Sequence, residues 1–210
     1  MHIIAMNGSP RLTGNTAIAL GWMADELARE GITVTTVQLG DKAFRGCAAC
    51  DRCNSPEDTL CALPDDGIND LIRMLRAADG FIIGSPTYFG GMAGTLKSVL
   101  DRVFYAGRRN GGFRNKIGGA AVAVRRGGGA EAYNQLITYF HLSGMVVAPS
   151  QSWGQAFGAR KGEVAQDVEG QQLLRLHANA MAWLLKMKVA TKDSIPLPRV
   201  EDRVLMNFIR

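Results

Sequence analysis

Four cysteines lie within fifteen residues of this 210-residue chain, which contains no other cysteine. Cys47, Cys50, Cys53 and Cys61 follow the spacing C-x2-C-x2-C-x7-C. Because iron–sulfur clusters take four thiolates and compact bacterial motifs share the C-x2-C-x2-C run, this loop is a candidate [4Fe-4S] site. Zinc is a second alternative, although zinc sites usually pair two C-x2-C units that are far apart. Free or redox-active thiols are the third, and the spacing leaves all three open.

A second chemical feature is the glycine-flanked loop at residues 8–16. It supplies hydroxyl, guanidinium and amide donors from Ser9, Arg11, Asn15 and Thr16. The loop leads into a predicted helix, whose N-terminal N–H groups and dipole favour a bound anion. It is neither a Walker A loop nor a Gly-x-Gly-x-x-Gly fingerprint. We interpret it as a phosphate-binding loop, with an ordinary capped turn as the alternative.

Two further loops have the composition of a site for a planar ring. Residues 84–91 place the adjacent aromatics Tyr88 and Phe89 between glycines, which suits a wall against a flat heterocycle. Residues 125–129 combine two arginines with three glycines. The glycines leave backbone N–H groups free to meet the edge of a ring, and the arginines could meet a second phosphate.

The elements that must position these loops alternate between strand and helix. Apolar periodicity predicts strands at 2–6, 32–39, 80–84, 117–124 and 145–148, and helices at 15–29, 66–78, 93–105, 130–143 and 163–187. This alternation predicts a three-layer, doubly wound α/β fold with a flavodoxin-like five-stranded parallel sheet of order 2-1-3-4-5. Because loops after parallel strands emerge at one edge, we expect the three loops and the cysteine loop to meet there.

The domain limits follow from the same pattern. Residues 1–188 are predicted to form one flavodoxin-like domain, and residues 189–210 a C-terminal arm. The arm contains two prolines and an amphipathic stretch from Val200 to Ile209. We interpret it as a segment that packs on a neighbouring subunit, with a loosely ordered terminus as the alternative. Trp153 and Gln155, just after the last strand, are expected to fill the core or to border the site.

Composition limits the cellular setting and the partners. No stretch approaches the roughly 18 to 20 apolar residues of a membrane helix, and the first residues lack the features of a signal peptide. We therefore expect a cytoplasmic protein without membrane contact, in a compartment where thiols stay reduced. The net charge is +5, but Lys and Arg are scattered, which argues against nucleic acid as a partner.

Several motifs recur in order and carry a family resemblance. They are Gly8-Ser9-Pro10-Arg11 with Gly14-Asn15-Thr16, then Gly84-Ser85-Pro86-Thr87-Tyr88-Phe89-Gly90, then Leu96-Lys97 with Asp101-Arg102. Over about residues 1–150 the chain resembles the NADPH-dependent FMN reductase and multimeric flavodoxin family. The resemblance implies bound FMN, reduction by NAD(P)H and a homodimer or homotetramer, because the flavin site of this family is usually completed across a subunit interface.

The resemblance also assigns residues. It implies that Ser9, Arg11, Asn15 and Thr16 hold the FMN phosphate. Contacts to the isoalloxazine ring are implied for Pro86, Thr87, Tyr88, Phe89 and Gly90, with Gly127 and Gly128 at its other edge. Lys97, Asp101 and Arg102 are expected to serve helix packing or subunit contacts rather than chemistry.

Three functions remain open. The first is an FMN-dependent NAD(P)H oxidoreductase that passes electrons to a small acceptor such as a quinone or a free flavin. The second follows from the cysteine loop, which resembles that of the iron–sulfur flavoproteins: a [4Fe-4S] cluster and FMN would transfer electrons between redox-protein partners. The third is a non-enzymatic nucleotide-binding module. No catalytic side chain is predicted, because the flavin carries the redox chemistry and His2, His141 and His177 are expected in structural roles.

Overall fold

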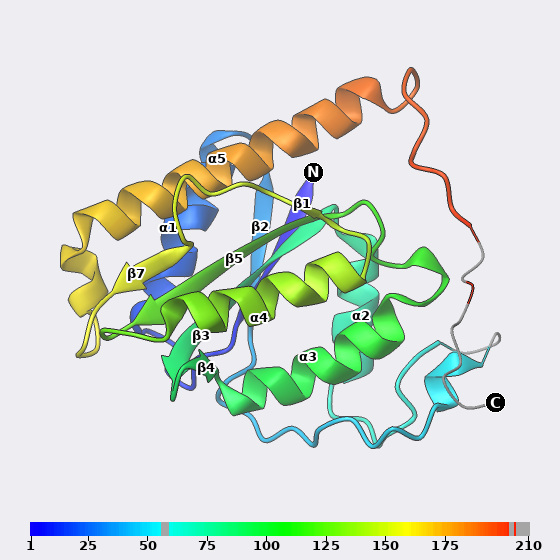
Figure 1. Ribbon diagram of the computed structural model, residues 1–210, viewed down its shortest axis with the longest axis horizontal. Helices are drawn as coiled ribbons and strands as arrows, with labels where there is room; N and C mark the ends of the chain where they lie inside the picture. Colours follow the sequence, from blue (N-terminus) through cyan, green and yellow to red (C-terminus); the bar gives the residue numbers. More distant parts are fainter. Residues whose placement is uncertain (56–58, 202–203, 205–210) are drawn as a thin grey trace.

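The computed structural model describes residues 1–55, 59–201 and 204, and it has a parallel sheet between two layers of helices (Figure 1). The central strands are β1 (His2–Asn7), β2 (Thr33–Gln38), β3 (Gly80–Tyr88), β5 (Ile117–Val124) and β6 (Val146–Val147). Their order is β2-β1-β3-β5-β6, with parallel pairing between neighbours. Counted in chain order without the short hairpin strand β4, this is the predicted order 2-1-3-4-5, so the fold prediction is confirmed.

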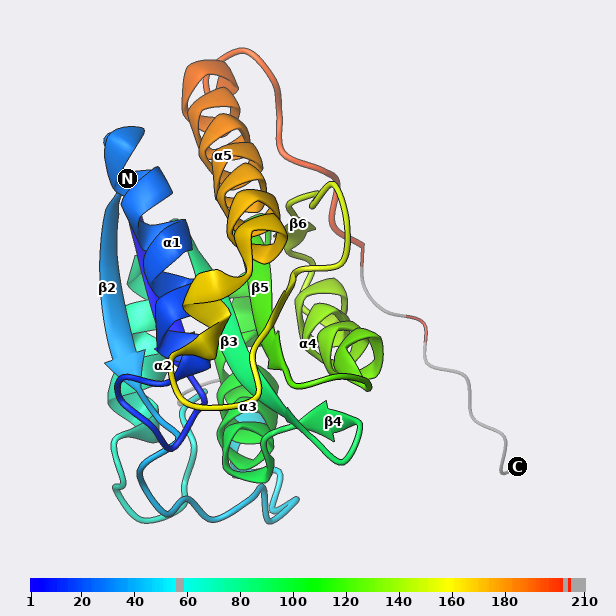
Figure 2. The same cartoon turned by 90° about the vertical axis from the view of Figure 1, so that its left-hand side faces the viewer.

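The helices divide between the two faces of the sheet. Helices α1 (Asn15–Arg29) and α5 (Val168–Thr191) cover one face, and α2 (Ile68–Ala77), α3 (Gly94–Gly107) and α4 (Gly129–Leu142) cover the other (Figures 1 and 2). Alternate residues of β1 enter the two cores, because successive strand side chains point to opposite faces. Strand β5 is buried along its whole length, as expected of a strand covered on both sides.

Two short strands extend the sheet beyond the prediction. Strand β4 (Gly91–Met92) pairs antiparallel with the end of β3 through a two-residue turn. Phe89 and Gly90 in this turn have φ values of 50° and 76°, the left-handed pair that a tight type I′ hairpin requires. Strand β7 (Gln155–Phe157) pairs parallel with the carboxyl half of β5. Both strands are too short to show a periodicity in the sequence.

The largest differences from the predicted boundaries lie at the end of β3 and at both ends of the last helix. Strand β3 runs four residues past Gly84, because its end is paired with β4 and with β5. The last helix begins at Val168, since residues 163–166 form a separate 3-10 turn (η3) and Asp167 caps the helix by accepting from the N–H of Gly170. It continues to Thr191, which is three residues beyond the predicted domain limit.

The segment after β6 corrects one interpretation. Gln155 is buried, but Trp153 is 67% exposed, so the prediction that Trp153 fills the core is wrong. The predicted amphipathic stretch at 200–209 lies mostly outside the described residues. Among the helices of the described part, none is both long and apolar enough to cross a membrane.

Candidate functional site

The phosphate loop joins β1 to α1 and is held by the ends of two strands. The side-chain oxygen of Asn7 accepts from the N–H of Ser9 at 3.1 Å, and its amide donates to Gln38 at 2.7 Å. Gln38 in turn donates to the carbonyl oxygen of Ser9 at 2.6 Å. The N-cap of α1 is Gly14, which offers no side-chain cap, so the first N–H groups of the helix are open to an anion. This geometry fits a phosphate.

The predicted phosphate donors differ in their surroundings. Ser9 and Thr16 are buried within the loop and the first helical turn, whereas Arg11 is exposed above them. The Asn15 side chain already forms hydrogen bonds within the protein. Its amide donates to the carbonyl oxygens of Gly158 and Arg160, both at 3.0 Å, and its oxygen accepts from a third residue of the same segment, Gly162, at 2.8 Å. Asn15 thus fastens residues 158–162 to the phosphate loop, and its role as a phosphate ligand stays a prediction.

The second and third loops meet at the same edge of the sheet. A Cβ added to Gly128 would lie 2.6 Å from the Cα of Gly90 and 3.3 Å from the Cγ2 of Thr87, so the two loops touch through glycine backbone. Gly127 beside it has open space around it. The structure therefore brings together the two loops that the sequence assigned to a planar ring.

The β3 loop combines a buried hydroxyl group with exposed aromatic side chains. Thr87 has a buried hydroxyl oxygen without a hydrogen-bond partner among the described residues. Tyr88 is half exposed and Phe89 fully exposed at the hairpin turn, while Pro86 is half-buried beneath them. An orphaned buried hydroxyl beside exposed aromatic rings fits a heterocycle with polar edges and a flat face.

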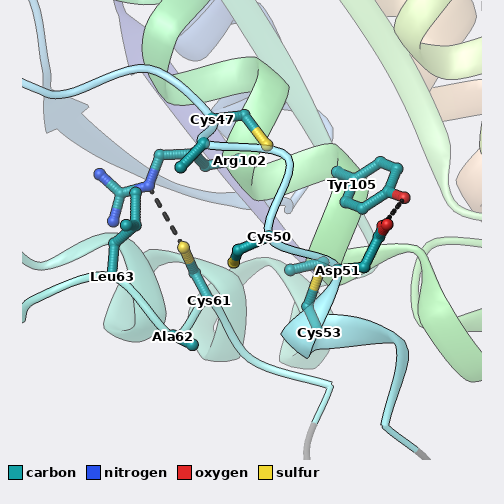
Figure 3. Close-up of a pocket in the computed structure, with 11 residues that line it drawn as sticks. Cys47, Cys50, Asp51, Cys53, Cys61, Ala62, Leu63, Arg102 and Tyr105 are labelled. Carbon is teal, nitrogen blue, oxygen red and sulfur yellow. Dashed lines mark hydrogen bonds between the residues drawn. The ribbon is translucent and has the colours of Figure 1, made fainter.

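All four cysteines line one pocket (Figure 3). Cys47 and Cys50 are exposed, Cys61 is half-buried, and Cys53 is buried within the 3-10 turn η1 (Arg52–Asn54). Burial raises the pKa of the Cys53 thiol, against the opposing positive charge of Arg109. The four sulfurs surround one space, which is the number and type of donor that a four-iron cluster takes.

The same pocket fits a single metal ion less well. A zinc ion needs its sulfurs about 2.3 Å from one point. Within residues 1–55, 59–201 and 204, no three Cys, His, Asp or Glu side chains converge in that way. A four-iron cluster instead spreads its four thiolates around a larger body than a single ion.

The cysteine loop is fixed to the α2–α3 layer by several contacts. The backbone of Cys61 exchanges two hydrogen bonds with the Asn69 side chain, both at 2.9 Å. Tyr105 donates to the carboxylate of Asp51 at 2.6 Å, as Figure 3 shows. Arg102 of α3 donates through Nε to the sulfur of Cys61 at 3.3 Å. These contacts fix the loop against α2 and α3.

Arg102 is the residue whose role the sequence missed. It was expected to serve helix packing or subunit contacts, but its side chain is 1% exposed and lines the cysteine pocket, with Nε directed at Cys61 (Figure 3). Lys97 and Asp101, by contrast, pair with each other at 2.8 Å and meet Tyr139 of α4, which agrees with helix packing. The Asp-Arg motif gave no signal that separates the two neighbours, because only the helix rotation decides which one faces the cysteines.

The position of the cysteines corrects a second expectation. The loop leaves the carboxyl end of β2 but then runs along α3, away from the edge that carries the other loops (Figure 1). The pocket residues Arg102 and Ala106 lie eight and twelve residues after Gly94, where α3 begins near that edge. At 1.5 Å per residue this is about 12 to 18 Å. The expectation that the cysteines lie beside the ring-binding loops is wrong, because a long β2–α2 connection frees the loop from the strand end.

A doubly wound parallel sheet with a phosphate loop after its first strand defines this chain as a flavodoxin-like α/β protein. The family model for NADPH-dependent FMN reductases matches residues 1–159. The chain belongs to this family.

Two curated relatives align with the chain over nearly their whole length. An iron–sulfur flavoprotein of Methanocaldococcus jannaschii is 33% identical over 89% of this chain and 98% of its own. One from Methanosarcina thermophila is 29% identical over 92% of this chain and 100% of its own. The family resemblance drawn from the motifs, including that of the cysteine loop to iron–sulfur flavoproteins, is therefore confirmed.

Solved structures support the fold alone, because their sequence identity is low. RosB, in a complex with 8-demethyl-8-formylriboflavin-5′-phosphate, aligns with a TM-score of 0.72 at 16% identity and covers 100% of this chain and 94% of its own. An archaeal flavodoxin aligns with a TM-score of 0.58 at 17% identity over 89% of this chain and 99% of its own.

Proposed function

We propose that the protein is an FMN-dependent oxidoreductase in which a [4Fe-4S] cluster, held by Cys47, Cys50, Cys53 and Cys61, exchanges electrons with the flavin. One observation carries the proposal: all four cysteines line a single pocket in which a guanidinium group lies beside a sulfur. The curated relatives that match most of the chain are named iron–sulfur flavoproteins, which supports the same assignment. A cluster supplies single electrons, whereas the flavin handles one or two.

The chain would bind FMN with two sets of groups. Ser9, Arg11, Thr16 and the open N-terminus of α1 would hold the phosphate, because both the donors and the helix dipole favour an anion. Asn15 would keep residues 158–162 against that loop, as it does through its three hydrogen bonds.

The ring would lie against the β3 and β5 loops. Thr87 would give its orphaned hydroxyl a partner on the ring, and Gly128 would let backbone approach the ring edge closely. The exposed rings of Tyr88 and Phe89 would shield one side of the site from water.

The cysteine loop would act as a preformed frame. Its thiolates would bind the irons, while Asn69 and Arg102 keep Cys61 oriented toward the pocket. Four unpaired cysteines suit a reducing compartment such as the cytoplasm. The redox partner of the cluster would be another protein, since the exposed Cys47 and Cys50 lie at the surface.

Metal and flavin content of anaerobically purified protein tests this function. The expected result is one FMN and about four irons per chain, with a broad brown absorbance that bleaches on reduction. Replacing Cys47 and Cys50 by Ser should remove the iron and leave the flavin bound. Iron-free protein after anaerobic reconstitution with iron and sulfide would exclude the cluster.

A second function is supported by the family model, whose description includes NADPH dependence. Here NAD(P)H would reduce the bound FMN, and a quinone, free flavin or other small acceptor would reoxidise it. The open aromatic hairpin at Tyr88 and Phe89 leaves one face accessible to a nicotinamide ring. Stopped-flow mixing with NADPH and with NADH should bleach the flavin absorbance with at least one of them. If neither nucleotide bleaches the flavin, NAD(P)H-dependent reduction is excluded and only the electron-transfer function remains.

A further inference from the structure

The Arg102 guanidinium makes more contacts than an ion pair requires. Its two terminal nitrogens bind both carboxylate oxygens of Asp66, and Nη1 also donates to the carbonyl oxygen of Arg45 at 3.2 Å. The remaining donor, Nε, points to the sulfur of Cys61 at 3.3 Å (Figure 3). One buried side chain of α3 therefore binds the cysteine loop on both sides of its cysteines.

All three nitrogens of the Arg102 guanidinium donate hydrogen bonds in this arrangement. The planar fork grips the carboxylate with two nitrogens, and only a guanidinium has a third nitrogen that can donate sideways at the same time. A lysine would keep the charge but could not form all of these bonds. The arrangement places a positive charge and an N–H donor at one cysteine out of four.

A positive donor at a ligand sulfur has a defined effect on a metal centre. Hydrogen bonds to the sulfurs and net charge around a cluster set its reduction potential, and groups behind the ligands orient them. Reduction of a cluster adds one negative charge, which a nearby cation stabilises more than it stabilises the oxidised form. The partial neutralisation by Asp66 moderates this effect, because its carboxylate lies on the far side of the same guanidinium.

Resting on the proposed function, we infer that Arg102 is a positioning residue that orients Cys61 and raises the reduction potential of the cluster. Asp66 has the opposite electrostatic effect while it holds the same guanidinium in place. The pair therefore sets the potential at which this chain accepts an electron. If the pair had only a structural role, the reduction potential of the cluster would not depend on whether the positive or the negative charge is removed.

The experiment compares two variants that remove opposite charges from one ion pair. Arg102→Gln and Asp66→Asn are purified anaerobically with FMN and iron, and the midpoint potential of the cluster is measured by electron paramagnetic resonance during a redox titration. Arg102→Gln should shift the potential to more negative values, and Asp66→Asn to more positive values. Arg73→Gln is the matched control, because Arg73 forms an exposed pair with Asp70 on α2.

Cluster retention provides the second measurement. Loss of iron to a chelator should be several-fold faster in Arg102→Gln than in wild type, since Cys61 loses the donor that orients it. If Arg102→Gln does not fold, as judged by circular dichroism, Arg102→Lys replaces it. That variant keeps the charge without the fork, and it should shift the potential in the same negative direction by a smaller amount.

The outcomes separate the two proposals. Potentials that shift in the same direction in both variants, or that do not shift, would overturn the role of Arg102 and leave the proposed function standing. A wild-type protein that binds FMN but no iron would overturn the cluster and this inference together. Opposite shifts with an unchanged Arg73→Gln control support both.

Discussion

At the scale of single residues, several buried polar atoms of the described side chains are not satisfied by the protein itself, and one of them lies in the candidate site. The Thr87 hydroxyl and both ring nitrogens of His177 are buried without a hydrogen-bond partner in the described part of the chain. Such groups cost free energy unless a ligand or water binds them. Thr87 lies near the end of β3, in the loop proposed to bind the ring, whereas His177 lies in the core between α5 and β5. The Thr87 hydroxyl therefore indicates a bound ligand, whereas the unpaired ring of His177 lowers the stability of the folded protein.

Thr87→Val should weaken FMN binding and leave the apoprotein equally or more stable. The variant keeps the shape of the side chain but removes the hydroxyl that would bind the ring, which costs about 1 kcal/mol, or roughly fivefold in affinity. Quenching of FMN fluorescence on titration measures the affinity, and urea unfolding of the apoprotein measures stability. Thr138→Val is the control, because Thr138 donates to Asn134 on the exposed face of α4. If Thr87→Val and wild type bind FMN with equal affinity, the Thr87 hydroxyl does not bind the flavin.

His177 predicts a loss of stability in mild acid. Burial lowers the pKa of His177 from 6.5 to about 4 in the folded protein. Between these values the unfolded chain binds a proton that the folded chain does not, so the free energy of unfolding falls as the pH falls. At pH 5 the loss is about 2 kcal/mol.

Urea unfolding at pH 7.5 and pH 5 should show a smaller difference for His177→Leu than for wild type. His141→Leu is the matched control, because His141 is exposed on α4. If wild type and His177→Leu lose the same stability between the two pH values, another group causes the loss.

At the scale of elements, α3 runs from the phosphate loop to the cysteine pocket. Its first turn follows β4, and the side chain of Leu96 lies directly under Gly8 of the phosphate loop, where an added Cβ would come within 2.6 Å. Further along, Arg102 and Tyr105 line the cysteine pocket. The helix therefore fixes the spacing between the two candidate cofactor sites.

The glycines of the β5 loop allow a test at this scale. Gly128→Ala should destabilise the loop by about 1 kcal/mol or more, because Gly128 has φ of 79° and its added Cβ would meet Gly90. FMN affinity should fall about tenfold as the two loops separate. Gly127→Ala is the matched control, since Gly127 has open space and no left-handed φ. Equal flavin affinities for the two variants would contradict the contact between the loops.

Apolar periodicity predicted both bounds of a long helix and of a strand that is buried on both faces. The bounds of α1 (Asn15–Arg29) and β5 (Ile117–Val124) match the prediction at both ends. Strands β4 and β7 were missed, because two or three residues carry no period and their pairing depends on β3 and β5. The loops at 8–14 and 125–128 were predicted from local signals, because glycine and proline mark turns.

At the scale of the whole molecule, the described part of the C-terminal arm lies along the surface of the protein. After α5 the described chain has no regular structure, and residues 195–198 line one pocket together with the end of α5. Ile195, Leu197, Val200 and Val204 are each more than half exposed. Exposed apolar residues on an extended segment are typical of a surface that another chain covers.

Deletion of residues 192–210 should therefore reduce the size of the assembly. We expect wild type to sediment as a dimer or tetramer at micromolar concentration and the shortened chain as a smaller species. Leu197→Ser with Val200→Ser should act in the same direction without shortening the chain. Sedimentation velocity measures both, and a monomeric wild type would remove the proposed role of the arm in assembly.

The sequence by itself determined the strand order, the positions of three glycine-containing loops and the cysteine spacing, because each depends on residues close together in the chain. Only the tertiary structure decided that the cysteines lie along α3, that Asn15 is engaged by residues 158–162, and that Arg102 faces Cys61. Arg102 and Cys61 are 41 positions apart, and Asn15 and Gly158 are 143 apart. Such contacts depend on how helices rotate and pack against the sheet, and no local pattern of residue types specifies that rotation.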